Sequence, residues 1–474
     1  MLEEASPLLG GQQKATPKWV SIYWLSTVVF CLSTAGSILN VPLTQLIEDN
    51  ICSRYAQQGT PTERHCKTDD IQSELAYLNG NLSLVEAVVG LFVAFPFGVL
   101  ADRVGRKPVM ILSVIGASLA LAWELAVIAF PKIVRVQAIL AGPLFTVVGG
   151  GNTVLLANLY SIASDLVTQS DRYPLKDTNF TKLASAFFLM AFSSLAGASL
   201  GPALSVKLME TFSPWVAAFA SFFVNLIALI PLFSIPETLS ILKPASTTAN
   251  DNIGSEESHP NTFKFCLSQS FQLLIVSFAS LKSYSIILVL ATFLTVAPEI
   301  LGTSQFMAQY ISKRFGLSLA RTGYLLTLRG VIHMVVLLFI LPLLSKLLLQ
   351  YRNPAVKDLI LARASVAFAA VGALCMAAPQ IGMVMVGLAV HSLGSGLTAL
   401  CRTRLKLNTA IGIVETTGSL LAGPALAWLF ETGMRLGGMS LGLPYFGLAG
   451  SFVFCLIDLL FVQIPSSEGA SASD

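Results

Sequence analysis

The chain has 474 residues, of which 54% are apolar and 12% are charged, and its net charge is +3. Soluble domains carry roughly 25% charged residues, so this chain has about half the usual share. A water-soluble fold of this length could not bury so much apolar surface, and so small a net charge gives no sign of a nucleic-acid partner. The composition therefore predicts an all-α membrane protein whose solvent is the lipid bilayer.

Long apolar runs recur along the chain, and about 20 such residues are needed to cross the hydrocarbon core of a bilayer. The run from Ala364 to Cys401 is too long for one crossing, so we divide it at Ala378-Pro379-Gln380. We predict twelve transmembrane helices, approximately at 19–47, 77–101, 108–131, 136–164, 183–206, 211–236, 284–310, 322–348, 358–378, 381–403, 408–431 and 444–464.

The distribution of basic residues predicts how these spans are oriented. An even number of crossings places both termini on one side of the membrane. Lys and Arg are more frequent on that side, most clearly in the short loop Arg103-Val-Gly-Arg106-Lys107. The positive-inside rule therefore predicts cytoplasmic termini. The cell membrane is the expected location, and the acidic dileucine string Glu4-Ala-Ser-Pro-Leu8-Leu9 leaves the vacuolar membrane open.

The cysteines and histidines show no metal-binding or cofactor-binding pattern. The sequence contains no CxxC, no HExxH and no P-loop string, so we expect neither a metal nor a cofactor nor direct use of ATP. Cys52 and Cys66 lie in one polar loop that the predicted orientation places outside the cell. A disulfide can form there, and two free thiols are the alternative.

A polar stretch from 238 to 262 leaves six spans on each side of it. The segment from Phe263 to Leu281 then has apolar residues at the spacing of a helix lying along the membrane surface, with a partly disordered linker as the alternative. The predicted organisation is a cytoplasmic tail at 1–18, a six-helix bundle at 19–237, a cytoplasmic linker at 238–282, a second six-helix bundle at 283–464 and a cytoplasmic tail at 465–474.

A short internal repeat supports a duplicated architecture. Leu200-Gly201-Pro202-Ala203-Leu204 in the fifth span matches Ala422-Gly423-Pro424-Ala425-Leu426 in the eleventh. These positions are equivalent if the protein consists of two six-helix halves, which is a common plan in secondary transporters. Small residues let helices approach closely in lipid, so we expect Gly197, Gly201, Pro202, Gly423 and Pro424 to pack helices together.

The second span ends in Gly98-Val-Leu-Ala-Asp102-Arg103-Val-Gly105-Arg106-Lys107. This string, in this position, resembles the loop 2–3 signature of the major facilitator superfamily. The resemblance implies the twelve-helix fold of that family and a charge relay with the end of the fourth span. Carried over to this sequence, Arg106 would pair with Asp165 and the motif would latch one of two alternating conformations.

The rest of the chain resembles a fungal branch of that family that is distantly similar to the proton-coupled folate transporter group. Members of the branch are often assigned export of secondary metabolites, so the resemblance implies a similar role. The segments that carry it are Val148-Gly-Gly-Gly-Asn152, Ser164-Asp165, Pro236-Glu237-Thr238-Leu239, Tyr310-Ile-Ser-Lys-Arg-Phe315 and Gly442-Leu-Pro-Tyr445.

Acidic groups at membrane depth are costly, so each needs a functional or structural reason. Glu299 follows Pro298, which can open the helix, and the resemblance places its span at the central cavity. Glu299 is therefore our first candidate for proton coupling, with a structural ion pair to Arg329 or Arg321 as the rival. Glu86 in the second span is the next candidate.

Other polar groups at membrane depth can face a substrate. We assign Asn40, Asn152, Arg329 and His391 to the substrate cavity, although a lone helical histidine is more often structural. Glu124 and Asp458 belong to spans expected on the outside of the bundle, where pairing or snorkelling is expected instead.

The leading functional hypothesis is a monomeric secondary active transporter that exports a small organic metabolite or toxic compound in exchange for protons. Proton-coupled nutrient import is one alternative, for which the folate-transporter likeness argues. A membrane sensor that does not transport is another. No paired catalytic residues are apparent, so we do not expect an enzyme.

Overall fold

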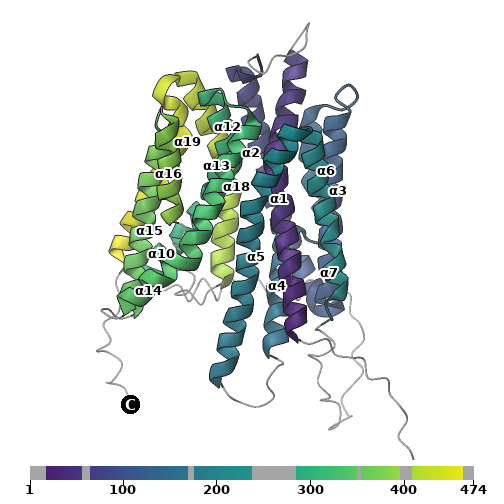
Figure 1. The fold of residues 1–474 in the computed structure, drawn as a ribbon, viewed down its shortest axis with the longest axis vertical. Helices are drawn as coiled ribbons and strands as arrows, with labels where there is room; N and C mark the ends of the chain where they lie inside the picture. Colours follow the sequence, from purple (N-terminus) through teal and green to yellow (C-terminus); the bar gives the residue numbers. More distant parts are fainter. Residues whose placement is uncertain are drawn as a thin grey trace, which may run out of the picture.

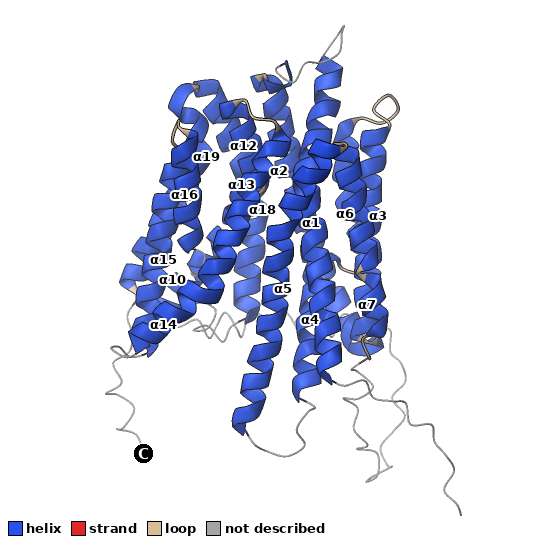
Figure 2. Cartoon of the chain, in the orientation of Figure 1, coloured by secondary structure: helices blue, strands red, loops and turns tan. Residues whose placement is uncertain are grey.

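The computed structural model describes residues 18–55, 65–168, 176–237, 284–349, 354–394 and 408–462. Within these ranges every regular element is a helix (Figure 2). The predicted linker at 238–282 and both predicted tails, apart from residue 18, lie outside the described residues.

The first half of the chain forms six crossings, as predicted. The third crossing, α3, is continuous, whereas the fourth and sixth are each divided into two pieces. The elements are α1 (Lys18–Tyr55), α2 (Asp69–Val104), α3 (Arg106–Ala129), η2 (Val136–Val147) with α4 (Gly151–Thr168), α5 (Lys176–Thr211), and α6 (Pro214–Ile227) with α7 (Leu229–Ser234).

The second half is more interrupted. Its elements are α10 (Tyr284–Ala291), η3 (Thr292–Thr295), α11 (Val296–Thr303), α12 (Gln305–Phe315), α13 (Leu319–Val335), the π-helical η4 (Val336–Ile340), α14 (Leu341–Leu349), α15 (Pro354–Met376), α16 (Ile381–Leu393), α18 (Asn408–Leu436), η6 (Gly438–Gly442) and α19 (Leu443–Phe461).

The described residues contain 9 helices long and apolar enough to cross a membrane, or up to 10 if one bent pair is a single span. That bent pair, which ends in α12, corresponds to the predicted seventh span. The two remaining predicted spans correspond to α16, a shorter apolar helix, and to α18, which has 29 residues. The chain is thus an all-α integral membrane protein.

The helices form two groups that follow the order of the sequence (Figure 1). The purple to teal helices of the first half lie on one side, and the green to yellow helices of the second half lie on the other. Contact between the halves is made mainly by α2 with α18 and by α5 with α13. The start of α1 and the end of α19 point toward the same end of the bundle.

Close packing of α1 against α5 depends on small residues, as predicted for the fifth span. A Cβ atom built on Gly197 would lie 2.7 Å from the backbone oxygen of Phe30. One turn later Gly201 lies against Ser37, and the Ser205 hydroxyl donates to the Ile38 carbonyl over 2.8 Å. These contacts bring the backbones of α1 and α5 together in a solvent that offers them no hydrophobic drive.

The fourth span differs from the single helix that we predicted. It begins as a 3₁₀ helix, η2, and is interrupted at Gly149, Gly150 and Gly151, which all have positive φ, before α4. The Ser113 hydroxyl of α3 donates to the Gly149 carbonyl over 2.5 Å and so satisfies one backbone group at the turn. A run of three glycines permits this backbone because none of them has a Cβ atom. Irregular backbone at this depth is tolerated where it is buried in protein or lines a cavity.

Candidate functional site

A cavity of about 410 Å³ lies among the first-half helices and reaches α11 and α12 of the second half. Its volume is within the range of small-molecule sites, about 300–1,000 Å³. Two of the predicted cavity residues, Asn40 of α1 and Asn152 of α4, line it. So does Glu86 of α2, one of the two proton-coupling candidates.

Glu124 also lines this larger cavity, although we expected it on the outside of the bundle. That expectation was wrong because α3 turns this face toward η2. Gly142 of η2 has no side chain, and a Cβ atom built there would lie 3.0 Å from the Glu124 carboxylate. The cavity is therefore lined by two acidic side chains, those of Glu86 and Glu124.

A smaller cavity of about 220 Å³ lies between α1 and α5 of the first half and α13 of the second. Arg329 and His333 line it from α13, and Asn40 lines it from α1. One position beyond Arg329, a Cβ atom built on Gly330 would lie 2.8 Å from the Ser199 hydroxyl of α5. This close approach places Arg329 at the junction between the two halves.

Glu299 lies on the half-buried face of α11 and is absent from the lining of both cavities. Its carboxylate is within electrostatic range of Arg329, but no salt bridge of 4.0 Å or less joins the two described residues. Arg321, the other rival partner, is exposed.

His391 differs from its predicted place in the substrate cavity. It lines neither of the two cavities and is only 1% exposed. The helix α16 carries it into the packing of the second half, where its ring lies 5.5 Å from that of Phe452. Packed helices thus surround this histidine, and its Nε2 atom has no hydrogen-bond partner among the described residues.

The motif residues after α2 form a connected cluster within the first half. Arg106 donates to Asp165 at the end of α4. The Lys107 ammonium donates to the carbonyls of Phe233 and Ile235, over 2.7 and 2.8 Å. These contacts tie the turn between α2 and α3 to the ends of two other helices. We call this region of the bundle the motif end.

Three motif residues take no part in that cluster. Asp102 and Arg103 are exposed, and a Cβ atom built on Gly98 would meet no described residue within 4 Å.

Glu237 completes the cluster, and sequence reasoning gave it no role. Its carboxylate accepts the backbone N–H groups of Arg106 and Lys107 over 3.2 and 3.1 Å. These N–H groups begin α3, and an acid placed there satisfies free donors and faces the positive end of the helix dipole. Gly105, with φ of 123°, makes room because a Cβ there would lie 2.7 Å from the carboxylate. In the sequence, the Pro236-Glu237 string was the only feature that pointed to a role for this residue.

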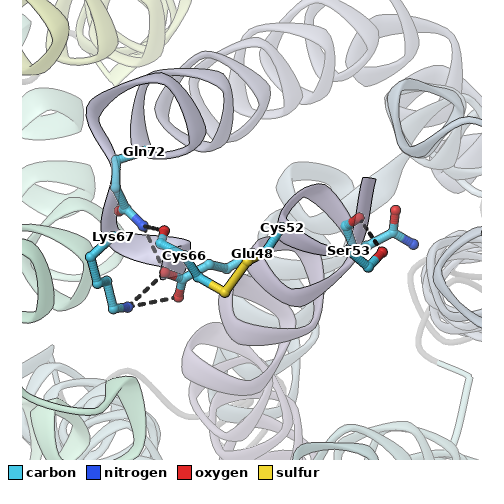
Figure 3. The surroundings of a disulfide bond; sticks show 7 residues. Glu48, Cys52, Ser53, Cys66, Lys67 and Gln72 are labelled. Atoms are coloured by element: carbon cyan, nitrogen blue, oxygen red, sulfur yellow. Dashed lines mark hydrogen bonds and ion pairs between the residues drawn. A yellow bond between two sulfur atoms is a disulfide. The ribbon is translucent and has the colours of Figure 1, made fainter. Parts of the chain in front are cut away.

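At the opposite end of the bundle, Cys52 and Cys66 form a disulfide (Figure 3). Beside it, Glu48 of α1 is 3% exposed and accepts hydrogen bonds from Lys67 and Gln72, each at 2.6 Å. The disulfide and Glu48 thus fix the turn η1 (His65–Lys67) against α1 and α2. We call this region the disulfide end.

Replacing both cysteines with serine is expected to lower the free energy of unfolding by about 3 kcal/mol, because the bond closes a loop with a sequence separation of 14 residues. Thermal unfolding of the purified protein, with and without reductant, measures the difference. Cys375→Ser, at a free cysteine, is the control and should change little. Equal melting temperatures for the double variant and the wild type would contradict the expectation.

The halves meet through polar contacts at the disulfide end. Lys313 of α12 forms an ion pair of 2.6 Å with Asp69 and donates to the Lys67 carbonyl. Gln309 donates to the Gln72 backbone over 2.7 Å. Further along α2 and α5, the described residues add two more hydrogen bonds between the halves, from Tyr77 to Glu431 and from Tyr324 to Glu210.

Deeper in the bundle, a glycine pair continues this contact between α2 and α18. A Cβ atom built on Gly80 would lie 2.6 Å from the carbonyl oxygen of Gly423, the repeat glycine predicted to pack helices. The hydrogen bonds and ion pairs that join the halves through described residues all lie toward the disulfide end. The bundle is therefore closed at that end.

Two helical bundles with internal cavities that charged and amide side chains help to line define a polytopic membrane protein of the transporter class. The family model described as Major Facilitator Superfamily matches residues 23–427. The chain belongs to this family, as the motif after α2 predicted.

Relatives and solved structures agree with this assignment. The "MFS efflux pump atnC" of Emericella nidulans is 28% identical over 94% of this chain and 88% of its own length. The "Efflux pump ustT" of Aspergillus flavus is 26% identical over 85% and 80%. The fold is similar to the xylose transporter XylE from E. coli, with a TM-score of 0.59 and 13% identity over 94% and 100% of the chains. The human organic anion transporter MFSD10 has a TM-score of 0.54 at 16% identity, over 94% and 100%.

Proposed function

We propose that this protein is a secondary active transporter that exports a small organic molecule, such as a secondary metabolite or toxic compound, in exchange for protons. The observation that carries the proposal is a ligand-sized cavity that lies among the first-half helices and reaches the second half, in a bundle whose halves are joined through described residues by polar contacts toward one end. Such an arrangement suits alternating access, in which the halves rock about a central site. The names of the two fungal relatives favour export as the direction.

The proposal assigns the motif end to the cytoplasm and the disulfide end to the outside, with both termini cytoplasmic and the cell membrane as the location. The basic loop before α3 supports this orientation, and so does the disulfide, which requires an oxidising compartment. In this orientation the closed disulfide end makes the conformation inward-facing, ready to take up a cytoplasmic substrate.

For the proton path we propose Glu299 and Glu86, of which Glu299 is the first choice. Each pH unit across the membrane is worth about 1.4 kcal/mol per proton, which is about tenfold in accumulation. Glu299→Gln cannot carry a proton, so substrate accumulation in proteoliposomes should fall by about tenfold for each unit of imposed pH gradient. Exchange of substrate against substrate, which needs no proton movement, should continue.

The control for this prediction is the wild type with a protonophore, which should lose accumulation to the same extent. Accumulation that survives the protonophore would remove proton coupling from the proposal. If the protonophore abolishes accumulation by the wild type but Glu299→Gln accumulates substrate normally, proton coupling stands and only the role of Glu299 is rejected. Direction is tested separately, since deletion in the host should raise the intracellular amount of an exported metabolite.

A further inference from the structure

The two cavities meet at shared structural elements. Asn40 of α1 lines both of them. Ser304 lines the smaller cavity and Gln305 lines the larger one, and these neighbours form the junction between α11 and α12, where the axis bends by 45°. A ligand that lies across Asn40 and this bend can therefore reach into both cavities.

The charges in the two cavities have opposite signs. Glu86 and Glu124 line the larger cavity, and Arg329 lines the smaller one. No hydrogen bond or ion pair joins any of these three side chains to another residue in the described part of the chain. Glu299 is within electrostatic range of Arg329, but its carboxylate is not within 4.0 Å of the guanidinium. The N–H donors of Arg329 therefore remain available to a ligand.

Charged groups at membrane depth that have no protein partner call for a counter-charge from elsewhere. An unpaired charge in a low-dielectric interior is strongly unfavourable, and a bound ligand can relieve it. An ammonium group can donate to two carboxylates at once, and a guanidinium binds a carboxylate with two parallel hydrogen bonds. The acidic cavity therefore suits a cationic group, and the basic cavity suits an anionic group.

The geometry points to a single dipolar site for a zwitterionic small molecule. Its ammonium group binds at Glu86 and Glu124, its carboxylate binds at Arg329, and its polar centre lies beside Asn40. The assignment rests on the proposed transport function and adds the substrate class to it. The Asn40 side-chain oxygen is buried and has no hydrogen-bond partner, so it is available to an N–H group at the centre of such a ligand.

The test uses the full chain in proteoliposomes with an imposed pH gradient and three forms of one probe. The probes are phenylalanylalanine, its N-acetyl derivative and its C-terminal amide. The three probes have nearly the same shape. The free dipeptide carries both charges, the N-acetyl derivative carries only the negative charge, and the amide carries only the positive charge. We expect transport of the free dipeptide to exceed that of either derivative by about tenfold or more, because each derivative leaves a charged group of the site unpaired.

Two variants assign the charges to their cavities. Arg329→Gln should remove the preference for a free carboxylate, so that the amide is transported as well as the dipeptide. Glu86→Gln combined with Glu124→Gln should remove the discrimination against the N-acetyl form. A changed order of preference among probes is a result that misfolding cannot produce. Arg321→Gln is the matched control, because this arginine is on the same helix as Arg329 but is exposed and lines neither cavity.

Equal transport of the three probes, or transport of none, would overturn the zwitterion assignment. The same conclusion follows if Arg329→Gln and Arg321→Gln have the same effect. The proposed function is judged by a separate measurement, namely proton-driven uptake of metabolites from a fungal culture extract into the same vesicles. Uptake of some metabolite without a zwitterion preference would leave transport standing and reject only the substrate class.

Discussion

Gly423→Leu is expected to reduce transport to near background while leaving the amount of protein in the membrane unchanged. The Gly423 backbone packs directly on Gly80 of the other half, so a leucine side chain there has no space. Small residues at such crossings set how closely two membrane helices approach. The variant should therefore be unable to close its disulfide end, and the alternating cycle should stop.

The expected failure to close the disulfide end is measured separately, by cysteine labelling. Gln309 is 1% exposed and sits in the contact between the halves. A cysteine introduced at this position should react slowly with a membrane-impermeant maleimide in the wild type and several-fold faster in Gly423→Leu. Gly450→Leu is the control, since a Cβ atom at Gly450 of α19 would meet nothing within 4 Å. Equal labelling and equal transport in both variants would show that the glycine contact does not govern closure.

Arg106→Ala is expected to lower the initial rate of proton-driven transport by about tenfold or more. The substitution removes the partly buried ion pair between Arg106 and Asp165, and removing one member of such a pair is costly. It also frees the turn between α2 and α3 from the end of α4. Rates measured in proteoliposomes, normalised to the amount of reconstituted protein, test the expectation.

Two further variants distinguish the effect of the ion pair on the transport rate from the effect of the positive charge of the loop. Arg103→Ala removes a neighbouring charge that is exposed and should retain most of the activity. Exchange of the partners, Arg106→Asp with Asp165→Arg, should recover part of the rate lost in Arg106→Ala. If the Arg103 and Arg106 variants are equally impaired and the exchange recovers nothing, the pair has no special role.

Sequence reasoning predicted the membrane class, the family and the approximate crossings, because hydropathy and a motif of fixed spacing are local properties. The pairing of Arg106 with Asp165 also came from the motif and is present in the structure. The contribution of Glu237 could not be predicted from a pattern, because it depends on where the chain after α7 returns to the start of α3.

The direction in which side chains face was the hardest property to predict. Hydropathy places Glu124 at membrane depth but does not tell whether it faces lipid or protein. The deciding feature is the 3₁₀ helix η2 that begins the fourth span, because its Gly142 lies against the Glu124 side chain. In the seventh span, Pro298 drew attention to a helix opening, but the 45° bend lies after it, at Ser304. The location of such a bend depends on packing between the halves.

The long helix α2 carries two glycines in opposite situations. The Gly80 backbone packs against the facing backbone, whereas no described residue packs beside Gly98. They are 98 − 80 = 18 residues apart, a rise of about 27 Å. That rise nearly equals the roughly 30 Å hydrocarbon thickness of a bilayer. Among the described residues, α2 thus packs on the other half near one membrane face and has space beside it near the other, as expected if rocking of the halves exchanges the compartment that has access to the binding site.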